Sequence, residues 1–258
     1  MNRLQTLLSQ NLLTVNDIAS TFDHSLLAPT LTDAAMRKDL ESVRSYPLAS
    51  VCIKPYAVPL AAEALAKTEI ATCTVIGFPH GSNLPEIKAA EARVAFAQGA
   101  TEMDMVVNVG KVLSEDWDYV REDIRAVLEV VRNNSGILKV IFETDYVTAD
   151  RAKIRLCEIC SDLKADFVKT STGFGFVKGA DGGHRYTGAT EHDLRLMRDH
   201  CDPTVGLKAS GGVRSLEMVL KCIELGCTRI GVSATKELLA EAEKGGFAGK
   251  VANEHAGY

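Results

Sequence analysis

The chain has 258 residues, of which 46% are hydrophobic and 24% are charged, and its formal net charge is −5 at pH 7. This composition excludes a disordered, collagen-like or low-complexity chain, and a chain of this length can bury a large core without disulfides. The acidic balance and the lack of a basic cluster argue against a nucleic-acid partner. Because no apolar run approaches the ~20 residues needed to cross a bilayer, we also expect no membrane association.

Short β-branched runs alternate with longer segments of helical period along the whole chain. A first helical stretch covers Arg3–Leu13. The predicted strands then follow at Thr21–Ser25, Ala49–Ile53, Ile70–Gly77, Glu102–Asn108, Ile137–Thr144, Asp166–Ser171, Thr204–Ala209 and Arg229–Ser233. The predicted helices between them include Thr32–Ser45, Leu84–Gln98, Glu115–Asn133, Thr148–Leu163, Thr190–His200 and Ser215–Leu225. Early Pro85 and terminal Gly99 are typical of the two ends of such a helix.

Eight strand–helix units favour one of two α/β architectures, a closed (β/α)₈ barrel or an open doubly wound sheet. The open sheet usually has a glycine-rich turn after its first strand, whereas here the first strand runs into HSLLAPTLTD. Eight units in about 250 residues also match the usual size of the barrel. We therefore predict a TIM barrel over about residues 20–240 with an extra N-terminal helix, residues 3–13, that closes its floor. Because the sequence contains no linker, we expect residues 1–258 to form one domain that ends in a tail over 245–258.

The cysteines and the N-terminus indicate a reducing compartment. Seven cysteines are scattered over the chain, and several lie in apolar runs, as buried free thiols do. The N-terminus has no basic segment followed by an apolar core and a cleavage site, so we expect a cytoplasmic protein. Cys157 and Cys160 have C-x-x-C spacing but no second pair, and the six histidines form no H-x-H or H-E-x-x-H group. We therefore expect no metal site.

Charged residues interrupt four of the apolar strands, at Asp104, Lys139, Lys169 and Lys208. Side chains alternate along a strand, so each charge faces either the apolar helix layer or the lumen of the barrel. A lone buried lysine is costly, whereas charges from several strands can satisfy one another in one lumen layer. Lys169 and Lys208 lie on consecutive predicted strands, and two ammonium groups held side by side make one proton easier to lose. A neutral lysine in a carbonyl-binding pocket is the nucleophile of Schiff-base chemistry.

Glycine-rich loops follow the last two predicted strands. Gly211 and Gly212 lie after the Lys208 strand and before a helix, and Gly231–Ala234 lies at the end of the final strand. Barrels commonly bind phosphate at these loops, where helix N-termini and backbone N–H groups point at the anion. Thr170–Gly173 after Lys169 adds hydroxyl groups and another glycine. The pattern predicts a phosphorylated substrate.

Six motifs together resemble the 2-deoxyribose-5-phosphate aldolase family. They are FDHSLL (Phe22–Leu27), SVCIKP (Ser50–Pro55), GFPHG (Gly77–Gly81), EMDMVVN (Glu102–Asn108), VKTSTGF (Val168–Phe174) and GLKASGGVR (Gly206–Arg214), in family order over about residues 20–236. The resemblance implies a class I aldolase on a (β/α)₈ barrel that uses no metal or other cofactor. Such an enzyme reversibly cleaves 2-deoxy-D-ribose 5-phosphate to D-glyceraldehyde 3-phosphate and acetaldehyde, in the catabolism of deoxyribonucleosides.

The resemblance also implies roles for single residues. Lys169 would form the Schiff base, Lys208 would lower its proton affinity, Asp104 would relay protons and Lys139 would orient Asp104. Tyr258, the last residue, matches a terminal tyrosine that assists proton abstraction in some members. The substrate contacts would fall on Asp23, Cys52, Thr172, Gly173, Gly211, Gly212, Val213, Gly231, Ser233 and Ala234.

The segment after Thr172, GFGFVKGADGGHRYTGAT, is longer than in the shortest family members. One interpretation is a glycine-rich surface loop; the other is a lid in which Lys178, His184 or Arg185 approaches the phosphate. Two other functions stay open beside the aldolase: a different Schiff-base aldolase or a phosphosugar isomerase, and a non-catalytic barrel that binds a phosphorylated metabolite. The helix faces fit a monomer or a homodimer.

Overall fold

Eight parallel strands close into a barrel in the computed structural model, which describes residues 1–179 and 181–249. The strands are β1 (Phe22–Leu26), β2 (Ser50–Ile53), β3 (Ala71–Ile76), β4 (Glu102–Val106), β5 (Ile137–Ile141), β6 (Phe167–Lys169), β9 (Gly206–Ser210) and β10 (Arg229–Val232). Each pairs with the next in this order, and β10 pairs with β1. The predicted (β/α)₈ barrel is confirmed, and the open doubly wound sheet is wrong.

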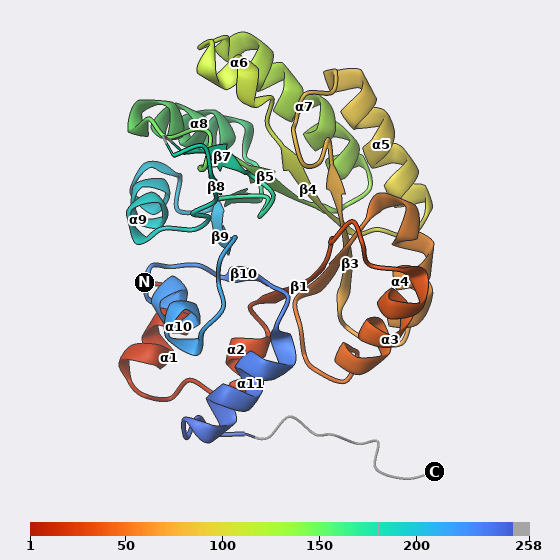
Figure 1. The fold of residues 1–258 in the computed structure, drawn as a ribbon, viewed down its shortest axis with the longest axis vertical. Coiled ribbons are helices and arrows are strands. Elements are labelled where there is room, and N and C mark those ends of the chain that lie inside the picture. The colour runs from red at the N-terminus through yellow and green to blue at the C-terminus, as the bar shows by residue number, and fades with distance from the viewer. Residues whose placement is uncertain (180, 250–258) are drawn as a thin grey trace.

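Helices form a ring around these strands (Figure 1). They are α3 (Asp33–Val43), α4 (Val58–Leu65), α5 (Pro85–Ala97), α6 (Val109–Leu113), α7 (Trp117–Asn133), α8 (Asp150–Leu163), α9 (Glu191–His200), α10 (Leu216–Glu224) and α11 (Thr235–Lys244), with a 3₁₀ turn, η1 (Pro55–Ala57), before α4. The structure places the starts of α5 and α10 within one residue of the predicted positions. Pro85 is the first residue of α5, and the Ser215 side chain caps α10 by accepting from the Met218 N–H. Within the described residues, no helix combines the length and the apolarity that a membrane span requires.

Two short helices replace the single N-terminal helix predicted over residues 3–13. Helix α1 (Arg3–Ser9) ends early because Asn11 adopts a left-handed backbone conformation, φ +56°. Thr14 then caps α2 (Val15–Ala19), which leads directly into β1. The Asn2 side chain donates to the carbonyl of Gly226, and the Gln5 side chain donates to the carbonyl of Glu224, the last residue of α10. These hydrogen bonds hold α1 against α10.

Alternation along β4 shows how the strands separate apolar from charged side chains. Met103 and Met105 are fully buried in the apolar layer between strands and helices, where each stabilises the fold by roughly 1.5–3 kcal/mol. Glu102 and Asp104 occupy the alternate positions and are buried in charged contacts inside the barrel. The strand thereby places its carboxylates in the lumen.

A separate buried ion pair lies in the helical layer, between α5 and α7. The Nζ of Lys88 is 2.6 Å from Oδ2 of Asp123, and both side chains are fully buried. Lys88 also donates to the carbonyl of Val106, and Asp123 accepts from the N–H of Asn108. The pair therefore ties two helices to the end of β4 without entering the lumen.

The long segment between β6 and α9 contains a small antiparallel hairpin, β7 (Val177–Lys178) with β8 (His184–Arg185). All four strand residues of the hairpin are exposed. In Figure 1 the hairpin lies beside α8 and β5. The segment thus contains regular secondary structure at 177–178 and at 184–185.

Candidate active site

Lys169 of β6 and Lys208 of β9 are direct partners in the register of two adjacent strands. Both side chains are almost completely buried, and the Nζ atoms of both lie 2.7 Å from the same oxygen, Oδ2 of Asp104. The two nitrogens therefore share one face of the wall and one carboxylate oxygen. This is the side-by-side arrangement of amines that the sequence predicts.

Further charges complete the network inside the barrel. The Nζ of Lys139 lies 2.9 Å from Oδ1 of Asp104 and 2.7 Å from Oε2 of Glu102. Asp23 accepts from Lys208 at 2.5 Å and also pairs with Arg229, which reaches Glu102 as well. Each side chain in this set, other than Lys169, thus contacts at least two groups of opposite charge.

The charges in this network do not cancel if every group is ionised. Among the described residues it holds four cationic side chains, Lys139, Lys169, Lys208 and Arg229, and three carboxylates, Asp23, Glu102 and Asp104. Buried charge without a partner is strongly unfavourable, so the cluster is balanced when one amine is neutral. Lys169 is the amine with the fewest partners, because within residues 1–179 and 181–249 its one ion pair is with Asp104.

The pKa values of the partners agree with this balance. Burial would raise the pKa of Asp104, but Lys139, Lys169 and Lys208 outweigh it and hold that pKa well below its ordinary value. Burial would also raise the pKa of Asp23, but Lys208 and Lys139 lower it below its ordinary value. Burial would lower the pKa of Lys208, yet Asp104 and Asp23 raise it, so Lys208 keeps its proton at neutral pH.

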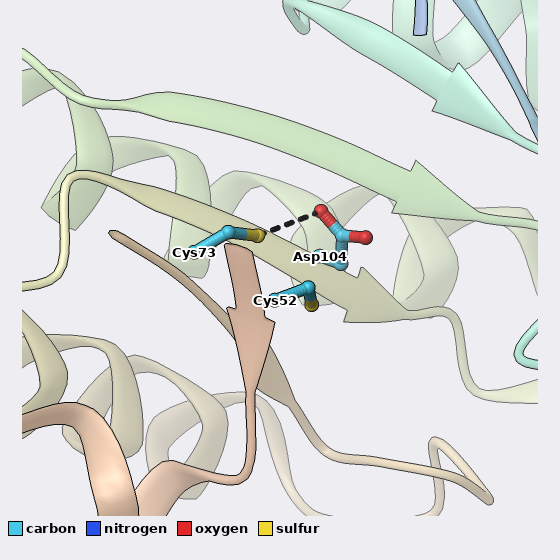
Figure 2. A group of neighbouring side chains, drawn as sticks. All are labelled: Cys52, Cys73 and Asp104. Carbon is cyan, nitrogen blue, oxygen red and sulfur yellow. Dashed lines mark hydrogen bonds between the residues drawn. The ribbon is translucent and has the colours of Figure 1, made fainter. Parts of the chain in front are cut away.

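Two cysteines border this carboxylate. Figure 2 shows Cys52, Cys73 and Asp104 on three neighbouring strands, with the Cys73 thiol directed at Asp104. Cys73 Sγ lies 3.4 Å from Oδ1 of Asp104 and 3.4 Å from Nζ of Lys139. Burial raises the pKa of Cys73, so this thiol stays protonated. The three donor atoms are close enough to hold a metal ion, but the lysine amines already occupy both oxygens of Asp104 and repel a cation there.

A cavity of about 250 Å³ opens above the lysine pair. Lys169 and Lys208 form part of its lining, and Leu27, Cys52 and Phe174 add apolar surface. On another side the cavity is lined by Gly211, Gly212, Val213, Gly231 and Ser233. Gly211 and Gly212 have positive φ angles of 92° and 78°, and Ser215, the cap of α10, follows three residues after Gly212. Such a backbone presents N–H groups and a positive helix end to an anion.

Two carboxylates at the end of β5 hold the segment that carries the hairpin. Glu143 accepts hydrogen bonds from the backbone N–H and the hydroxyl of Thr172, and burial raises its pKa. Asp145 accepts from the backbone N–H groups of Thr187 and Gly188. Both flanks of the hairpin are thereby fixed to the rim of the barrel.

The structure brings most of the predicted residues to one place. Asp23, Cys52, Thr172, Gly173, Gly211, Gly212, Val213, Gly231, Ser233, Lys169 and Lys208 all line the cavity. Asp104 and Lys139 lie behind the lysine pair, fully buried. Ala234 is not part of the lining; it is the residue before α11. Tyr258 lies outside the described residues.

The basic residues considered for the lid do not reach the cavity. Lys178, His184 and Arg185 are exposed, and none is part of the lining; Arg185 pairs instead with Asp181. Tyr186, the next residue, does line it, as do Arg214, Ser25 and Phe174, which the sequence reasoning did not single out. Of the ion network it missed Glu102 and Arg229. Glu102 could have been found, because it lies two residues before Asp104 and so on the same face of the strand.

Comparison with known proteins places the chain among aldolases. Residues 18–238 match the family described as DeoC/LacD family aldolase. The chain is 47% identical over 229 residues to the deoxyribose-phosphate aldolase of Rhodopirellula baltica, covering 89% of this chain and 90% of that protein. It is 44% identical over 225 residues to that of Enterococcus faecalis, covering 87% and 97%. The deoxyribose phosphate aldolase of Aeropyrum pernix, described as tetrameric, superposes with a TM-score of 0.80 at 25% identity, over 93% of this chain and 97% of that one.

Proposed function

Because the chain belongs to the DeoC/LacD aldolase family, we propose that its barrel reversibly cleaves 2-deoxy-D-ribose 5-phosphate to D-glyceraldehyde 3-phosphate and acetaldehyde. The observation that carries the proposal is the position of Lys169. Its amine borders the cavity, shares one carboxylate oxygen with a second lysine, and lies in a network that is balanced when one amine is neutral. A neutral amine beside a cation is the nucleophile that Schiff-base catalysis needs.

The reaction begins when the Lys169 nitrogen attacks C1 of the open-chain sugar. The carbinolamine that forms loses water and becomes a protonated imine, which withdraws electrons from the adjacent carbon. Because acetaldehyde retains C1 and C2 of the sugar, the bond that breaks is C2–C3. Its electron pair moves into the imine to form an enamine, while the C3 hydroxyl loses its proton and becomes the aldehyde of glyceraldehyde 3-phosphate. Protonation of the enamine at C2 and hydrolysis of the imine then release acetaldehyde and restore Lys169.

We assign the proton transfers to Asp104 working with Lys208. Asp104 touches both lysine amines through one oxygen, so it can pass a proton between them or to a water molecule at the reacting carbon. Lys139 occupies the other oxygen and, with Cys73, fixes the orientation of the carboxylate. We therefore regard Lys139 as a positioning residue.

We place the substrate phosphate at the glycine loops. Gly211, Gly212, Val213, Gly231 and Ser233 line the side of the cavity next to the start of α10. A phosphate bound there through backbone N–H groups would leave C1 of the sugar directed at the lysine pair. Asp23 and Cys52 line the same cavity near the lysines and would contact the sugar between its two ends.

Borohydride trapping tests the proposal. Incubation with 2-deoxy-D-ribose 5-phosphate and borohydride should reduce the imine and leave a covalent adduct, which peptide mass mapping should locate on Lys169. Lys169→Met should give no adduct. The matched control is Lys178→Met, which removes an exposed lysine outside the cavity lining and should leave the adduct intact. An adduct on another lysine, or none in an active preparation, would contradict the mechanism.

Substrate profiling separates this activity from a different Schiff-base aldolase or a phosphosugar isomerase. We expect release of glyceraldehyde 3-phosphate in a coupled assay, and we expect the rate to be the same with and without a chelator. An isomerase would convert a phosphosugar without forming acetaldehyde. A barrel that only binds phosphorylated metabolites would give no turnover at all.

We extend the proposal to the cellular setting of the enzyme. All seven cysteines are buried free thiols, which fits a reducing cytoplasm. We also propose that the whole chain works as one domain, since the segment before β1 packs on α10 and α11 instead of forming a core of its own.

A further inference from the structure

Tyr186 reaches the phosphate side of the cavity from the segment that carries the β7–β8 hairpin. Its ring lies against the glycine loop after β9: a Cβ added at Gly211 would lie 3.3 Å from the Cε2 of Tyr186. A Cβ added at Gly212 would lie 3.5 Å from the tyrosine hydroxyl oxygen. Tyr186 lines the same cavity as Lys169. Its hydroxyl is therefore next to the backbone that we assign to the phosphate.

The position of this tyrosine is fixed by its neighbours in the chain. Asp145 accepts from the N–H groups of Thr187 at 2.5 Å and of Gly188 at 3.1 Å. The N–H of Ala189 donates to the carbonyl of Gly211 at 3.0 Å, which joins the two loops directly. Gly188 has φ +69°, and a side chain there would collide with the Gly211 carbonyl, at 2.4 Å. The backbone of Gly188 and Ala189, just after Tyr186, thus packs against Gly211.

The hydroxyl of Tyr186 has no hydrogen-bond partner in residues 1–179 and 181–249. An unpartnered tyrosine hydroxyl that borders a cavity can donate its O–H to an oxygen of a bound ligand. We propose that this hydroxyl donates a hydrogen bond to a phosphate oxygen of the substrate, an inference that rests on the proposed function. This contact makes Tyr186 a specificity-determining residue for phosphorylated sugars. The inserted segment therefore acts at the phosphate through an aromatic hydroxyl, and not through its basic side chains.

The selectivity of the enzyme tests this role. A hydrogen bond to a charged group contributes enough binding that Tyr186→Phe should raise KM for 2-deoxy-D-ribose 5-phosphate about tenfold. The kcat/KM for unphosphorylated 2-deoxy-D-ribose should not change, because the lost contact is to the phosphate. The inhibition constant of inorganic phosphate, used as a competitive inhibitor, should rise by the same factor.

A matched control is available in the same part of the fold. Tyr146 is half-buried like Tyr186, but it does not line the cavity, and its hydroxyl faces the carbonyl of Phe176 at 3.4 Å. Tyr146→Phe should leave both KM values and phosphate inhibition unchanged.

The possible outcomes separate this inference from the proposed function. Unchanged KM and phosphate inhibition in Tyr186→Phe would overturn the inference, and so would an equal loss for the phosphorylated and the unphosphorylated sugar. Absence of turnover in the unmodified enzyme would overturn the proposed function instead. In that case the thermal stabilisation of the protein by inorganic phosphate would still decide the role of Tyr186: a stabilisation reduced by Tyr186→Phe supports the contact, and an equal one refutes it.

Discussion

Replacing Asp104 by asparagine removes the carboxylate that joins the three lumen lysines. Its two oxygens lie within 2.9 Å of the amines of Lys139, Lys169 and Lys208. Removing one partner of a buried ion pair costs about 3–5 kcal/mol, which for a chain of this length corresponds to a fall in melting temperature of roughly 6–20 °C. Because the same change removes the proposed proton relay, we also expect kcat to fall by about 10²–10⁴-fold.

The Lys88–Asp123 pair supplies the control for this substitution. Asp123→Asn makes the same chemical change in an equally buried ion pair that lies outside the lumen. We expect a comparable loss of stability by thermal unfolding, but a kcat within about threefold of the unmodified enzyme at a temperature where the variant is folded. If both variants lost kcat equally, or if Asp104→Asn kept its melting temperature, the argument from the lumen charges would be wrong.

Two further predictions concern the lumen carboxylates and the contact between Gly188 and Gly211. The pKa values of Asp23 and Asp104 are held below their ordinary values, so their stabilisation is complete above about pH 4 and is lost as pH falls through the folded-state values. Urea unfolding should therefore show a free energy that declines below about pH 4, with a shallower decline in Asp104→Asn; an equal slope would refute this. Gly188→Ala should raise KM for the phosphorylated sugar, because its Cβ would meet the Gly211 carbonyl at 2.4 Å. Gly182→Ala, at φ +78° with no atom within 4 Å, is its control, and equal KM values would contradict the seating of the two loops.

The barrel and the lumen charges could be predicted because both depend on short-range patterns. Alternation along a strand determines which face a residue occupies, and a charge within a strand buried on both sides has the lumen as its low-energy environment. Lys139, Lys169 and Lys208 follow from this rule alone. Glu102 follows from it as well, as the neighbour of Asp104 on the same face.

The parts that sequence reasoning missed depend on contacts between distant segments. Arg229 is the first residue of its strand, so its pairing with Asp23 and Glu102 needed the closure of β10 against β1. Tyr186 lines the cavity in a segment whose backbone is bound by Asp145, about forty residues earlier. The end of the first helix depends on a single residue, Asn11, in a backbone conformation that no periodicity signals.

Strands build the reactive centre of this protein, whereas its selective end is built from loops. Lys169, Lys208 and Asp104 lie on β6, β9 and β4, locked in register by the closed sheet. The glycine turn and the segment that contains Tyr186 lie beyond the strand ends, where the N–H of Ala189 donates to the Gly211 carbonyl and Gly188 approaches Gly211. An engineer who wishes to change the accepted aldehyde can therefore work on these loops and leave the strands that carry out the chemistry unchanged.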